Sequence, residues 1–143
     1  MKIPLPGYIA DQKNLGHSLI MKRLDGIIEL RCADVVAYTP EKIKENHEWI
    51  KKFADGKKAL VLTIAGEYTY VEPEARRYTS QGHHRHFVAA EAFLIRSLPQ
   101  RVIGMLFLKI NRPIVPARLF SIHHKEKAEE WLRLFQQAEV TSG

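Results

Sequence analysis

The hydrophobic pattern of the chain alternates between short apolar runs and longer stretches with helical periodicity. The apolar runs are typical of β-strands, because β-branched and aromatic residues are frequent in them and turn residues bound them. The first two runs flank Leu24-Asp25-Gly26, whose Asp-Gly pair is a strong hairpin signal. The pattern therefore predicts five strands, which lie at residues 16–23, 26–33, 58–64, 87–97 and 115–122.

The stretches between the later strands carry apolar residues every three to four positions, as one face of a helix requires. Prolines open three of them, since the missing N–H of proline is harmless in the first helical turn. The predicted helices start at Pro40, Pro73 and Pro99 and end near Gly56, Gln81 and Asn111. A fourth helix is predicted around 128–135, where Ala128, Trp131, Leu132 and Phe135 share one face.

The predicted helix at 99–111 has two apolar sides. Residues placed at 100° intervals assign the core-facing side to Val102, Ile103, Leu106, Phe107 and Ile110. The opposite side also contains apolar residues beside a glycine, which indicates a flat contact surface. Its predicted members are Arg101, Gly104, Met105, Leu108, Lys109 and Arg112.

Three interpretations of this outer surface stay open. A symmetric homodimer would place the surface against its own copy. An anionic membrane would attract the basic residues of the surface, which favours peripheral membrane contact. Scattered exposed apolar residues also occur on ordinary surfaces, and the N-terminal arm is a further candidate to cover them. We take the homodimer as the leading hypothesis.

The element order predicts an α/β fold. The order β-β-α-β-α-β-α-β-α implies a mostly parallel sheet of about five strands with an N-terminal antiparallel hairpin. Prolines and glycine near the start predict an N-terminal arm at 1–14, followed by a single domain at 15–138 and a tail at 139–143.

Composition places the chain among ordinary globular domains. It has 143 residues, of which 45% are hydrophobic and 27% charged, which fits one domain. Cys32 is the single cysteine, so no intramolecular disulfide forms. No apolar run approaches the ~20 residues of a membrane span, so we expect a cytoplasmic protein. The net charge of +6 comes from basic residues without a block of like charges.

Three segments near the C-terminus carry a resemblance to a known family. They are RVIGMLFLKIN at 101–111, RPIVPARLF at 112–120 and AEEWLRLF at 128–135. Together with the element order, they make residues 15–138 resemble small bacterial STAS-like (SpoIIAA-like) proteins. The resemblance implies the fold shared by anti-sigma-factor antagonists and the cytoplasmic STAS domains of anion transporters. It also implies a curved sheet with helices mainly on one side and a non-enzymatic role in protein–protein signalling.

The chain departs from that family at the phosphorylation switch. Antagonists with such a switch carry an Asp-Ser pair at the start of the helix after the third strand. The matching stretch here is Tyr70-Val71-Glu72-Pro73-Glu74, and Pro73 stands where the phosphoacceptor serine would be. Proline carries no hydroxyl, so the resemblance does not extend to phosphorylation at this position.

Polar residues are expected together where the parallel strands end, which is where ligands bind in open α/β sheets. Arg96 and Arg101 flank a turn at the start of a helix and are candidates to hold an anion there. The alternative is that they form surface ion pairs with nearby carboxylates. The candidate anion site consists of Arg96, Ser97, Arg101, Glu67 and Glu72.

No other constellation predicts chemistry. The run His83–His86 lacks a second cysteine and a spaced acidic partner, so polar loop histidines are the favoured interpretation over a metal site. His47 lies on the apolar face of its helix and is expected to be a hydrogen-bonded core residue. The chain shows no catalytic or nucleotide-binding motif, so we expect no enzyme activity and no cofactor. The basic stretch 76–87 matches no nucleic-acid-binding signature, so nucleic acid is not an expected partner.

These observations support two functional hypotheses. The first is a non-catalytic STAS-like interaction or regulatory module that self-associates through the 99–111 helix. The alternative is a carrier of small molecules or lipids with a pocket between the helices and the sheet. An apolar internal pocket favours the second hypothesis, and a solidly filled interior counts against it.

Overall fold

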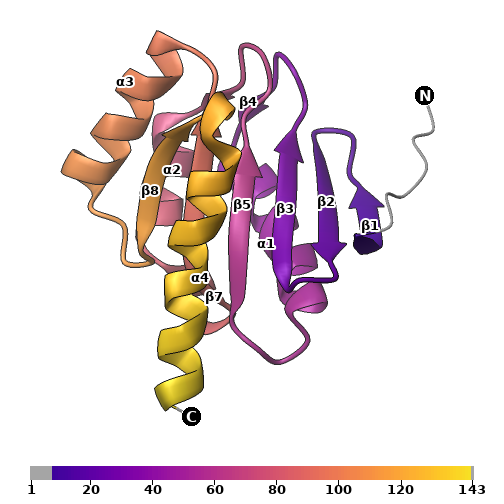
Figure 1. Cartoon of the computed structure of the whole chain (residues 1–143). Coiled ribbons are helices and arrows are strands. Elements are labelled where there is room, and N and C mark those ends of the chain that lie inside the picture. Colours follow the sequence, from indigo (N-terminus) through magenta and orange to yellow (C-terminus); the bar gives the residue numbers. More distant parts are fainter. Residues whose placement is uncertain (1–7, 143) are drawn as a thin grey trace.

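A mixed six-stranded sheet forms the centre of the molecule (Figure 1). The computed structural model describes residues 8–142, with side chains described to residue 136. The strands lie in the order β1-β2-β3-β5-β7-β8. The first three pair antiparallel, and β3, β5, β7 and β8 pair parallel, which confirms the α/β class and the N-terminal hairpin. Their bounds are β1 Ile9–Asn14, β2 Ser18–Arg23, β3 Ile27–Cys32, β5 Ala59–Ile64, β7 Val88–Ile95 and β8 Ala117–Ser121.

Strand β1 corrects the predicted N-terminal arm at 1–14. Residues 1–7 lie outside the described part, but Ile9–Asn14 form an edge strand that pairs with β2. In the sequence IADQKN the apolar residues Ile9 and Ala10 are followed by four polar ones, so its hydrophobic pattern does not indicate a strand. The backbone hydrogen bonds to β2 hold it in place, and a polar edge strand also resists pairing with other chains.

Three α-helices and several shorter elements lie between the strands, and a fourth α-helix follows the last strand. The α-helices are α1 Pro40–Ala54, α2 Pro73–Ser80, α3 Leu98–Leu106 and α4 Lys125–Ser142. The 3₁₀-helices η1 His83–His86 and η3 Ile122–His124, the π-helix η2 Phe107–Asn111, and the short parallel strands β4 Ala37–Tyr38 and β6 Tyr70–Val71 complete the chain. Helix α4 extends through the predicted tail at 139–143 to Ser142, because no glycine or proline interrupts the chain before Gly143.

The two faces of the sheet are covered differently. Helix α4 lies along one face, in front of the sheet in Figure 1, whereas α1 and α2 lie behind it. Ala128 and Leu132 of α4 are fully buried against the alternate residues of β5 and β7. On the other face, Ile50 and Phe53 of α1 pack on β2, β3 and β5. The inner parallel strands β3, β5 and β7 are thus covered on both sides, whereas no residue of the edge strand β8 is fully buried.

Helix α3 is oriented differently from the sequence prediction. It ends at Leu106, and the π-helical turn η2 then takes the place of the predicted last α-helical turn. Of the predicted core side, Val102, Leu106 and Ile110 are exposed, whereas Phe107 is buried and Ile103 half-buried. The side of α3 that faces the sheet is formed instead by Ile103, Gly104 and Phe107, because the glycine lets the helix approach Leu119 of β8 closely.

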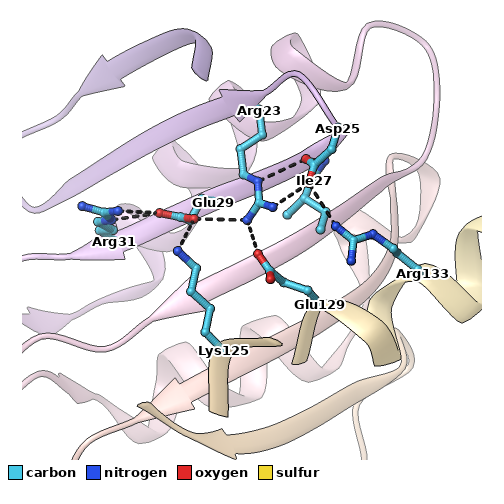
Figure 2. Close-up of polar contacts among 8 residues, drawn as sticks. All are labelled: Arg23, Asp25, Ile27, Glu29, Arg31, Lys125, Glu129 and Arg133. Atoms are coloured by element: carbon cyan, nitrogen blue, oxygen red, sulfur yellow. Dashed lines mark hydrogen bonds and ion pairs between the residues drawn. The ribbon is translucent and has the colours of Figure 1, made fainter. Parts of the chain in front are cut away.

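An ion-pair network attaches α4 to the β2–β3 hairpin (Figure 2). The Glu29 carboxylate is fully buried and contacts three cations: Arg23 at 3.3 Å, Arg31 at 2.9 Å and Lys125 at 3.0 Å. Arg23 also pairs with Glu129 of α4 at 2.5 Å. Burial raises the pKa of Glu29, but hydrogen bonds and charges from Lys125 and Arg31 outweigh this and leave its pKa below the usual range.

Replacing Glu29 tests how much this network stabilises the fold. We expect Glu29→Gln to lower the free energy of unfolding by about 3 kcal/mol, because it leaves buried cations without their counter-charge. Urea denaturation at pH 7 measures the loss. Glu126→Gln on the exposed side of α4 is the matched control and should change stability by less than ~0.5 kcal/mol. Equal stability of the two variants would contradict a structural role for the network.

Candidate functional site

A cavity of about 560 Å³ lies between the sheet and the helices α1, α2 and α3. Its floor comes from residues of the parallel strands that point away from α4, including Leu30, Thr63, Phe93 and Leu119. The surface of the cavity is mostly apolar. Its size lies within the 300–1,000 Å³ typical of small-molecule sites.

Helix α3 forms one wall of this cavity without filling it. Ile103, Gly104 and Phe107 face the interior, and Gly104 lies directly against Leu119 of β8. A Cβ atom at position 104 would approach the Leu119 side chain to 2.7 Å, so glycine permits this close contact. At the start of α3, Gln100 donates hydrogen bonds to the carbonyl oxygens of Gly66 at 2.9 Å and Thr69 at 3.4 Å. These contacts hold α3 over the sheet.

The exposed members of the lining mark the rim of the cavity. They are Tyr68, Tyr70, Ser97 and Pro99, which come from the loop before α2 and from the start of α3. The rim therefore lies at the carboxyl ends of β5 and β7, where ligands bind in open α/β sheets.

Asn46 of α1 is the unpartnered polar group of the cavity. Its residue is only 3% exposed, and its Oδ1 atom forms no hydrogen bond within the described part of the chain. Burying an amide oxygen without a partner costs roughly 1–3 kcal/mol. Because Asn46 lines the cavity, a bound molecule can supply the missing hydrogen bond.

A histidine–glutamate pair also borders the cavity, which Glu91 lines. His84 of η1 is fully buried, and its Nε2 atom contacts Oε1 of Glu91 at 2.5 Å. Burial raises the pKa of Glu91, but the hydrogen bond and charge of His84 outweigh it and lower its pKa below the usual range. The His47 ring stacks on His84 at 4.5 Å between ring centroids. Burial lowers the pKa of His47 to about 4, so His47 is neutral at physiological pH.

These contacts correct two expectations about histidine. His84 was expected to be a polar loop residue, but it is buried and bound to Glu91. His47 was expected to form a hydrogen bond in the core, but its described contacts are aromatic: it stacks on His84 and Tyr78 and meets the Phe87 ring edge to face. Within residues 8–142, no three potential metal ligands are grouped closely enough to hold a metal ion.

The thiol of Cys32 also lines the cavity. Burial raises the pKa of Cys32 to about 11, so the thiol is protonated at neutral pH. A protonated thiol is a poor nucleophile, because the thiolate is the reactive form. Cys32 therefore acts as a small apolar side chain in this wall.

The residues of the predicted contact surface on the 99–111 helix do not share one exposed face. Gly104 faces the cavity rather than the outer surface, and Leu108 is half-buried. Met105 is 40% exposed. The charged members of the predicted surface, Arg101, Lys109 and Arg112, are also exposed. The prediction that Gly104 lies on the outer surface was wrong, because sequence alone does not show how closely α3 approaches β8.

The predicted anion-binding residues have other contacts. Arg96 donates from Nε to the Ala65 carbonyl oxygen at 2.5 Å, and Ser97 caps α3 by accepting a hydrogen bond from the Gln100 N–H. Glu67 hydrogen-bonds through its backbone to Asp34 and Val35, and Glu72 precedes α2. No ion pair between Arg96 or Arg101 and these glutamates occurs in the described part. The anion site stays a prediction.

The low pKa of His47 predicts acid sensitivity. In the unfolded chain a histidine titrates near 6.5, and in the folded chain His47 titrates near 4. The unfolded state therefore binds more protons between these values, and stability is lost as the pH falls from about 6.5 toward 4. We expect His47→Phe, which keeps the ring stacking, to lose less stability between pH 7 and pH 5 than the wild type. Urea denaturation at both pH values measures this, and His86→Phe at an exposed position should retain the wild-type pH dependence.

Comparison with known proteins gives a family but no described function. No curated protein and no solved structure matches the chain. A family defined as "Domain of unknown function (DUF7793)" matches residues 20–136. This range runs from β2 to the second half of α4 and includes every strand that lines the cavity. The chain therefore belongs to the DUF7793 family.

Proposed function

We propose that the protein is a non-catalytic binder of an uncharged small molecule, which it holds in the cavity beneath α3. The observation that carries this proposal is the mostly apolar cavity of about 560 Å³ between α1, α2, α3 and the sheet. Cores of small domains are normally packed with few voids larger than a water molecule. A space of this size is therefore unusual for a small domain, and it is large enough to hold a ligand.

The polar groups of the cavity support a particular class of ligand. Asn46 offers an unpartnered amide oxygen, which accepts a hydrogen bond from a hydroxyl or amide group. The charged side chains of the lining already have partners, because Glu91 contacts His84 and Arg76 donates to the Val71 carbonyl oxygen. The ligand that fits is a molecule with an apolar body and one neutral hydrogen-bond donor, such as a medium-chain alcohol.

Predicted self-association through the 99–111 helix is a separate property. The resemblance to STAS-like interaction modules and the homodimer stay predictions for this chain. A cavity with an unpartnered polar side chain favours ligand binding more directly, so we place ligand binding first.

Filling the cavity tests the proposal. Thr63 lies on the floor, and Thr63→Phe places a ring in the space that a ligand would occupy. We expect 1-decanol to displace the fluorescent dye Nile red from the wild type and to bind at least tenfold more weakly to Thr63→Phe. Thr63→Val is the matched control, because it keeps the volume and should bind 1-decanol within about twofold of the wild type.

Two results would contradict the proposal. The first is a wild-type protein that takes up neither Nile red nor 1-decanol. The second is a Thr63→Phe variant that is folded by circular dichroism and binds 1-decanol as tightly as Thr63→Val. Decanoate provides a test of ligand class, since the lining offers its carboxylate no unpartnered cation within the described residues and it should therefore bind more weakly than 1-decanol.

Asn46 gives a prediction in which stability and binding change in opposite directions. Asn46→Leu removes the unpartnered amide oxygen, so we expect the free energy of unfolding of the ligand-free protein to rise by about 1 kcal/mol. The same change should weaken 1-decanol binding by roughly five- to tenfold, because one hydrogen bond is lost. Urea denaturation and dye displacement measure the two effects. A destabilised Asn46→Leu would show that the side chain has a structural partner instead.

A further inference from the structure

The positive charge of the chain is concentrated in one segment. Residues 92–125 contain six of the 22 Lys and Arg residues and none of the 16 Asp and Glu residues. The other 16 basic residues balance the 16 acidic ones, so this segment accounts for the whole net charge of +6. The segment runs from β7 through α3, η2 and β8 to the start of α4.

Three cations of this segment remain available on the surface around α3. Lys125 is paired with Glu29 within the ion-pair network, Arg96 donates to a backbone carbonyl, and Arg118 of β8 lies over the Phe120 ring. In contrast, Arg101, Lys109 and Arg112 are exposed and form no ion pair with any described residue. They are the charges that this surface presents to a partner.

The outer side of α3 is apolar as well. Leu98 is 72% exposed, Val102 49% and Met105 40%. Their spacing of four and then three residues places them on one face of the helix, opposite the side that lines the cavity. In Figure 1, α3 lies at the outer margin of the molecule beside β8, away from α4.

This apolar face continues onto the rim of the cavity. Leu98 lies between Ser97 and Pro99, which are both rim residues. Tyr68, another rim residue, is 82% exposed and belongs to the 66–69 loop that Gln100 binds. Tyrosine is favoured at the boundary between lipid and water, where its ring contacts apolar material and its hydroxyl stays hydrated. The exposed apolar face and the opening of the cavity thus adjoin each other.

We propose that this surface, formed by Tyr68, Leu98, Arg101, Val102, Met105 and Lys109, docks the protein on an anionic lipid membrane. The apolar side chains of α3 enter the interfacial region, and Arg101 and Lys109 contact lipid headgroups. Arg112 adds to the same positive field. No helix within residues 8–142 has the length and apolar character of a membrane span, so the contact is peripheral.

Charge favours a membrane over a second copy of the chain. A symmetric contact between two α3 faces would bring each cation near its own copy, with no acidic residue in 92–125 to neutralise it. An anionic membrane supplies the opposite charge over a flat area that matches an exposed helix face. The docked orientation also brings the rim of the cavity to the lipid surface.

Vesicle binding tests the proposal with the full chain. We expect the wild type to co-sediment with vesicles of equal parts phosphatidylglycerol and phosphatidylcholine at least tenfold more tightly than with phosphatidylcholine alone. Arg101→Gln/Lys109→Gln should weaken binding about 25-fold, at about fivefold for each basic side chain at the surface. Leu98→Ser/Met105→Ser should weaken it at least tenfold. Lys57→Gln/Lys58→Gln removes the same charge from two exposed lysines before β5 and should change binding by less than about twofold.

The following outcomes would overturn the proposal. They are equal binding to both kinds of vesicle, an equal loss in the Lys57→Gln/Lys58→Gln control, and a lipid-free wild-type dimer that Leu98→Ser/Met105→Ser separates in sedimentation velocity. The last outcome would assign the face to a protein interface. Thr63→Phe, whose change lies on the cavity floor, should bind vesicles like the wild type. Membrane docking and ligand binding can therefore fail independently.

Discussion

The need to cover the parallel strands of the mixed sheet on both faces determines the rest of this structure. Helix α4 meets this need on one face with fully buried side chains, Ala128 and Leu132, and an ion-pair network at its start. On the other face α1 packs closely on β2, β3 and β5. Helix α3 contacts β8 through Gly104 and leaves a space between itself and the strands β5 and β7. One face of the sheet is therefore a dense core, and the other contains the cavity, one wall of which is helix α3.

The two buried carboxylates, Glu29 and Glu91, also differ between the α4 face and the cavity face of the sheet. Glu29, on the α4 face, is neutralised by three cations, and this network also connects Arg23 to Glu129 of α4. Glu91, on the cavity face, has His84 as its hydrogen-bonded partner, whereas the Asn46 amide oxygen on the cavity wall lacks one within the described residues. A satisfied network rigidifies a fold, whereas an unsatisfied buried group marks a place where another molecule completes the bonding. The physical argument for a ligand site rests on this difference.

Turn and capping chemistry made much of the fold predictable from sequence. Asp25-Gly26 indicated the hairpin, and Thr39-Pro40 indicated the start of α1, where the Thr39 hydroxyl caps the helix. Strand β1 was missed, because a polar edge strand depends on its neighbour rather than on its own pattern. The cavity and its polar groups were not predictable either, since they depend on how far α3 stands from the sheet. His84 gave no local signal, because its partner Glu91 lies on the following strand.

The most direct test of the central claim is a crystal structure of the protein grown with 1-decanol. The account predicts electron density for the chain of the alcohol between α1, α3 and the strands β5 and β7, with its hydroxyl within hydrogen-bond distance of Asn46. The account would be contradicted by a structure in which Ile103 and Phe107 fill this space and α3 lies packed against the sheet with no ligand beneath it.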